Sequence, residues 1–164
     1  MKRAQETALI IKEKTAVPLV SSEFFVEVLY TSRLLGMEVA NPEAIDAIQT
    51  WYKNFHDPNF HLEDGENFAD LKKRALDGLS YITQRAEEHI VVVSHAFFMW
   101  IIAAAVIYGD ELTSAQCLGI MRGFDLMKNT GLTLVTFEAP MRKAIGELSS
   151  PWQLVVWNDH AHLG

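Results

Sequence analysis

The residue best placed to do chemistry is His95, which follows an uninterrupted run of β-branched residues. The run from Ile90 to Val93 predicts a buried strand, and the composition of residues 96–108 favours a helix. A histidine between the two would lie beyond the carboxyl end of the strand, where ligands bind in α/β proteins. The free backbone N–H groups that begin with Ala96 favour a phosphate or a carboxylate. We therefore predict an anion site at His95 and Ala96; the alternative is a polar side chain satisfied by a loop carbonyl.

The elements that must position this site alternate along the chain. Helical patterns cover residues 3–14, 42–55, 67–88, 96–108 and 110–121, and extended patterns cover residues 16–21, 90–93, 131–138 and 152–157. Strands separated by helices predict an α/β fold, in which helices cover both faces of a mostly parallel sheet. No repeat or linker divides the sequence, so we expect a single domain over residues 1–164.

Composition limits the class of protein and its partners. The chain has 164 residues, of which 49% are hydrophobic, so a sizeable core is expected. A net charge of −7 argues against nucleic acid and against an anionic membrane as partners. The apolar stretch 90–109 is interrupted by Ser94 and His95, which favours a strand and a buried helix over a membrane span. We expect a cytoplasmic protein.

No cofactor and no metal are expected. The sequence has no glycine pattern typical of nucleotide-binding loops. Asp159, His160 and His162 lie close together, but their spacing fits no standard zinc pattern. The single cysteine, Cys117, excludes an intramolecular disulfide and is expected to pack in the core.

Several short motifs, in order along the chain, resemble those of one family. They are Arg3-Ala4-Gln5-Glu6-Thr7-Ala8; Gly65-Glu66-Asn67-Phe68 followed by Arg74; Val91 to His95; Asn129-Thr130-Gly131; and the closing Asn158 to Leu163. Together they resemble the histidine phosphatase superfamily, the phosphoglycerate mutase-like proteins. Asn67 stands where the family pattern has serine.

The resemblance implies a phosphomonoesterase that acts on a small phosphorylated metabolite through a phosphohistidine. It implies that Arg3 and His95 bind the phosphoryl group, because a guanidinium fits phosphate oxygens in pairs. Glu27 best matches the acid that protonates the leaving oxygen, and Glu23 is the alternative. Without the family match, we would interpret Arg3 as a surface arginine, and Glu27 or Glu23 as a solvated carboxylate in a loop. Inorganic phosphate or sulfate is then an expected ligand.

The chain departs from the family at one decisive point, because it contains no Arg-His-Gly. In the family that motif carries the nucleophile at the end of the first, central strand, which precedes the segment matching Arg3 to Ala8. We therefore expect a fold that lacks its first central strand, and a chain that is inactive as given. A non-catalytic remnant or anion-binding module is the alternative function. An unrelated α/β ligand-binding domain is a third.

Loss of a central strand also has a structural consequence. It would expose the edges of Val17 to Ser21 and Ile90 to Val93, and unpaired edges invite pairing with another chain. We predict a homodimer through these edges in preference to closure of the gap. Bridging by a peptide that precedes the sequence is a further possibility.

Overall fold

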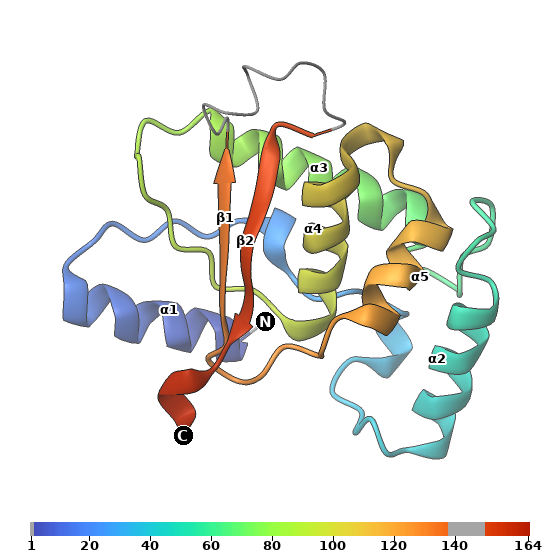
Figure 1. The fold of residues 1–164 in the computed structure, drawn as a ribbon. Helices are drawn as coiled ribbons and strands as arrows, with labels where there is room; N and C mark the ends of the chain where they lie inside the picture. Colours follow the sequence, from blue (N-terminus) through green and yellow to red (C-terminus); the bar gives the residue numbers. More distant parts are fainter. Residues whose placement is uncertain (1, 138–149) are drawn as a thin grey trace.

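The computed structural model describes residues 2–137 and 150–164. Its core is built around helix α4 (Ala96–Tyr108), which packs against α3 (Phe68–Thr83), α5 (Ser114–Gly123) and strand β2 (Trp152–Asp159) (Figure 1). An α-helix that is apolar on every side must be covered on every side. The buried residues of α4 are Phe98, Ile101, Ile102, Ala103, Ala104, Ala105 and Val106. The predicted helix over this stretch is therefore confirmed, and no helix among the described residues is long and apolar enough to cross a membrane.

Side-chain caps fix where α2 and α3 begin. Helix α2 (Pro42–Lys53) starts after Asn41, whose side chain accepts a hydrogen bond from the Glu43 N–H, as its sequence predicts. Helix α3 starts after Asn67, which forms a capping box with Asp70. It ends at Thr83 rather than at the predicted Glu88, because the polar residues that follow Thr83 bring no apolar stripe to bury.

The segment after α4 differs from its predicted helix. A short 3-10 turn (Gly109–Glu111) comes first, and α5 then begins at Ser114 rather than at Asp110. Thr113 and Gln116 form a capping box that starts α5 at this point. The apolar pattern predicts the helix, but the residue at which it begins is set by the capping box.

The sheet is smaller than predicted and of the opposite kind. Strands β1 (Leu132–Phe137) and β2 pair antiparallel, and they are the whole sheet in the part of the chain that the structure describes. Both were predicted as strands; Glu138, the predicted end of the first, lies outside the described residues. The prediction of a mostly parallel sheet is not met, because residues 16–21 and 90–93 are extended without a ladder partner. An extended segment becomes a strand only when a neighbour satisfies its backbone.

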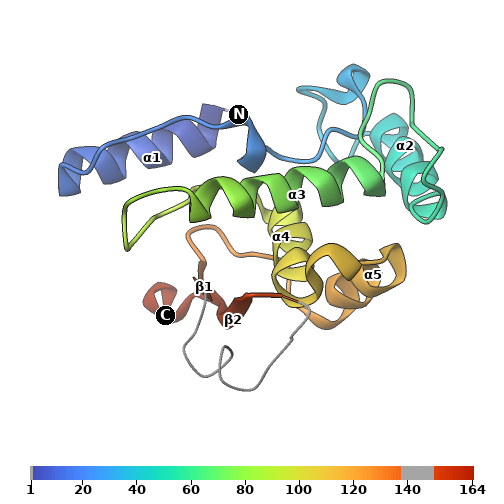
Figure 2. The same cartoon turned by 90° about the horizontal axis from the view of Figure 1, so that it is seen from above.

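Helix α1 (Lys2–Thr15) lies at one end of the molecule and α2 at the other (Figures 1 and 2). None of the α1 residues is buried. The chain leaves α1 through Ala16, whose φ of 57° reverses its direction, and the extended segment then leads back to the body. The helix thus begins at the body and projects away from it.

Candidate functional site

A groove of about 560 Å³ lies where the two unpaired extended segments meet α1. It is lined by residues of α1, by residues 17–22, by the end of α3 and by residues 89–93, and it includes His95. Most of the lining side chains are apolar, and several are strongly exposed: Val20 is 58% exposed and Val91 is 75% exposed. The groove is therefore apolar along most of its walls and polar at one end.

His95 supplies that polar end. It is the N-cap residue of α4, but its side chain makes no capping hydrogen bond. The residue is 5% exposed, and its Nε2 is the one buried side-chain nitrogen or oxygen among the described residues that lacks a hydrogen-bond partner. Leaving a buried polar atom unsatisfied is costly, so such an atom at a groove indicates a place for a ligand.

Glu27 caps α4 in place of His95. Its carboxylate accepts hydrogen bonds from the backbone N–H of Phe98 at 3.0 Å and of Phe97 at 3.4 Å, and also from the N–H of Val28 at 3.0 Å. A negative charge at a helix N-terminus is favourable because the helix dipole is positive there. The capping contacts bring this carboxylate next to His95.

The charges around His95 act on its protonation in opposite directions. Burial lowers the pKa of His95 below its usual value, and the charge of Arg3 lowers it further. The Glu27 carboxylate raises it, but less than burial lowers it. The imidazole is thus held neutral near neutral pH, in the form that can donate or accept one hydrogen bond at Nε2.

The predicted site residues fall into two groups. Arg3, in the first turn of α1, is exposed and lies close enough to His95 to affect its charge. The Ala96 N–H, at the first position of α4, is one of the N–H groups that have no acceptor within the helix. The structure therefore gathers Arg3, His95 and Ala96, with Glu27 beside them. Glu23 is exposed in a 3-10 turn (Glu23–Phe25), and no described residue donates a hydrogen bond to it, so it does not share these contacts.

Glu66 and Arg74, motif residues without a role predicted from the sequence, hold the segment that carries Glu27. Arg74 binds the Glu66 carboxylate with two nitrogens, at 2.7 and 2.9 Å, and donates through Nη1 to the carbonyls of Phe24 and Val26. Glu66 in turn accepts from the Leu29 N–H at 2.9 Å. The pair therefore fixes the backbone on both sides of Glu27.

The neighbouring motif residues explain why this contact can form. A Cβ at Gly65 would overlap the carbonyl oxygen of Tyr30, so only glycine allows the two backbones to lie this close. Asn67, where the family pattern has serine, still caps α3 by accepting from the Asp70 N–H at 3.0 Å. Its amide also donates to the Pro58 carbonyl at 2.8 Å, a second bond that anchors the preceding loop. The departure from serine is thus conservative.

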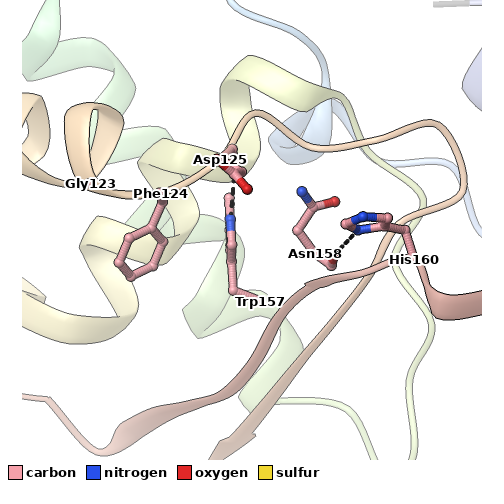
Figure 3. A pocket seen from close by; sticks show the side chains of 6 residues that line it. All are labelled: Gly123, Phe124, Asp125, Trp157, Asn158 and His160. Carbon is pink, nitrogen blue, oxygen red and sulfur yellow. Dashed lines mark hydrogen bonds between the residues drawn. The ribbon is translucent and has the colours of Figure 1, made fainter.

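A second cavity, of about 330 Å³, lies between the end of α5 and β2 (Figure 3). Several of the polar groups that line it are hydrogen-bonded to one another. Trp157 donates to the Asp125 carbonyl, and His160 donates through Nδ1 to the Asn158 carbonyl. The Asn158 side chain accepts from the Lys128 N–H and donates to the Leu126 carbonyl. These contacts fasten the turn before β1 to β2, so we assign the closing motif a structural role.

No metal site is formed in residues 2–137 and 150–164. Histidine, cysteine, aspartate and glutamate side chains nowhere gather there in a group of three or more that could hold an ion. Asp159, His160 and His162 do not converge: His160 turns to the Asn158 carbonyl, and His162 is hydrogen-bonded to Thr130 at 3.0 Å.

Comparison with known proteins gives one match. A family model described as the histidine phosphatase superfamily (branch 1) matches residues 1–144. No curated protein and no solved structure matches the chain.

Proposed function

Because the chain belongs to branch 1 of the histidine phosphatase superfamily, we propose that it binds inorganic phosphate, or the phosphoryl group of a small phosphomonoester, at Arg3, His95 and Ala96. One observation carries this proposal: the buried Nε2 of His95 has no partner, and His95 is one of the residues that line the groove. A phosphate oxygen would satisfy it. The nearby guanidinium of Arg3 and the first N–H of α4 favour a ligand of negative charge.

Glu27 limits what the site can do to the ligand. In the reaction that the family implies, the P–O bond breaks as a P–N bond forms to a histidine, and a carboxyl group gives its proton to the leaving oxygen. Both carboxylate oxygens of Glu27 already accept backbone N–H bonds at α4. To act as the acid, Glu27 would have to take up a proton and give up at least one of these bonds.

We further propose that the chain by itself does not hydrolyse its ligand. The covalent route needs one histidine as nucleophile and a second to steady the phosphoryl group. The motif that would supply the nucleophile, Arg-His-Gly, does not occur in this sequence. With His95 as the binding histidine, the phosphoryl group is held but not transferred.

Calorimetric titration with inorganic phosphate tests the binding proposal. His95→Asn and Arg3→Gln should each weaken binding by about tenfold or more, because each removes a hydrogen bond to a charged group. His89→Asn and Arg85→Gln are matched controls, since both residues line the groove but neither belongs to the proposed three-residue site. The controls should bind like the parent chain. Absence of binding to the parent chain, or equal losses in the controls, would overturn the proposal.

The absence of turnover is tested separately with a phosphate donor labelled on phosphorus. We expect no protein-bound label and no release of phosphate above the buffer rate. Acid-labile label on His95 would show that this histidine is itself a nucleophile, and would contradict the non-hydrolytic part of the proposal while leaving the binding site intact.

A further inference from the structure

Phosphate binding at one end of the groove does not explain why most of its lining is apolar. Residues 17–21 and 90–93 both line it, and no hydrogen bond of the described chain joins the backbone of either segment to another segment. Backbone N–H and C=O groups are paired in the great majority of folded proteins, and a row of them on an extended segment is a template for a strand. The groove therefore offers two strand edges at once.

The side chains of the groove give the same indication. Seven aliphatic residues on α1 and the two segments are strongly exposed: Leu9, Val17, Leu19, Val20, Ile90, Val91 and Val92. Together they leave on the order of 600 Å² in contact with water, a large part of the ~800 Å² that each partner buries in a standard interface. An apolar patch of this size is at the upper end of what monomeric proteins expose, and such patches often mark interaction sites.

We propose that the occupant of the groove is a second copy of this chain, and that residues 90–93 of each copy insert as a strand between residues 17–21 and 90–93 of the other. The insertion is reciprocal, so the two copies would share one continuous four-stranded sheet. Its order would be residues 17–21 of one copy, 90–93 of the second, 90–93 of the first, and 17–21 of the second. A two-fold axis through the centre makes the contact closed, so the assembly stops at a dimer.

The distribution of charge favours this pairing and sets its direction. Residues 90–93 carry no charge, so two copies can approach without repulsion along the ladder. Glu87 and Glu88 precede the segment in the sequence. An antiparallel pairing places the two acidic pairs at opposite ends, whereas a parallel pairing would set each glutamate beside its own copy. The pairing is therefore antiparallel and centred between Val91 and Val92.

Sedimentation equilibrium over a hundredfold range of protein concentration tests the proposal, with two matched variants. Val91 and Val39 are both 75% exposed, so neither lysine substitution should unfold the chain. Val91→Lys should weaken dimerisation by about tenfold or more, because the dimer would bury an unpaired ammonium. Val39→Lys lies outside the groove and should dimerise like the parent chain.

Hydrogen exchange identifies the surface that pairs. The amides of residues 90–93 should become protected as the parent chain dimerises, and should stay unprotected in Val91→Lys. A parent chain that is monomeric throughout, a Val91→Lys dimer of unchanged strength, or assembly that continues past the dimer would each overturn the proposal. None of these outcomes bears on phosphate binding, so the two proposals fail separately.

Discussion

At the scale of single residues, His95 and Glu27 have different roles at the start of α4. His95 stands at the N-cap position of α4, but Glu27 provides the cap. The imidazole is thereby left without a partner at Nε2. A residue that caps a helix from another segment connects that segment to the helix. The N–H groups of α4 therefore hold the Glu27 side chain in place, and Glu27 stabilises the start of α4.

Glu27→Gln separates the structural role of the carboxylate from its effect on the ligand. Loss of the negative charge at the α4 N-terminus should reduce the free energy of unfolding by about 0.5–2 kcal/mol. The same change should tighten sulfate binding several-fold, because it removes a like charge beside the ligand. Urea denaturation and calorimetric titration measure the two effects. Glu23→Gln, which changes an exposed side chain, should move neither, and weaker sulfate binding in Glu27→Gln would contradict the assignment.

The lowered pKa of His95 predicts the pH dependence of anion binding. A bound anion favours the charged imidazolium, so the pKa of His95 rises in the complex. Affinity for the anion should therefore increase as pH falls through the range between the two pKa values, and level off below the lower one. Sulfate is the appropriate probe because it does not itself titrate near neutral pH. Titrations at a series of pH values should lose this slope in His95→Asn; an unchanged slope would exclude His95 as its source.

At the scale of elements, the contact between α3 and the segment before η2 (Ser32–Leu34) positions Glu27. Arg74 and Glu66 are only 15% and 19% exposed, and their bidentate pair is joined to carbonyls and an N–H of that segment. The Arg74 guanidinium also lies 3.8 Å from the centre of the Phe98 ring, which connects the pair to α4. One side chain thus links three parts of the fold.

Arg74→Lys should be strongly destabilising. Lysine keeps the charge but cannot reach a carboxylate and two carbonyls with a planar group, so about 2–3 kcal/mol of stability should be lost. Arg85→Lys is the matched control, because Arg85 also pairs with a glutamate, Glu87, but at the surface. That change should cost less than ~0.5 kcal/mol. Equal losses in the two variants, measured by urea denaturation, would show that Arg74 has no special role.

At the scale of the whole molecule, burial is uneven. Helix α4 carries the core and packs against α3, α5 and β2, whereas α1 has no buried residue. A helix of this length that lacks packing is marginal in water. The stability of the molecule is therefore concentrated on one side of the groove.

Hydrogen exchange at low protein concentration should reveal this difference. The α4 amides are expected to exchange only through global unfolding, and those of α1 to exchange far faster through local opening. Mass-spectrometric exchange of peptides from each helix makes the comparison within one sample. Equal protection of α1 and α4 in the monomer would contradict the uneven burial.

What the sequence determines by itself is local. Asn41 with Pro42 and the apolar run of residues 96–108 specify helices through short-range hydrogen bonds and burial, and these elements are confirmed. The apolar pattern alone does not locate the end of α3, which comes where the apolar stripe stops, or the start of α5, which the capping box of Thr113 and Gln116 sets.

Only the tertiary structure decides which extended segments become strands and which glutamate meets His95. Residues 132–137 and 152–159 pair and form a ladder, whereas residues 90–93, which are all β-branched, remain extended without a partner, as do residues 16–21. A strand is completed by a partner distant in sequence, which no local pattern specifies. For the same reason, the contact of Glu27 with the start of α4, 70 residues away, could be expected only from the family resemblance.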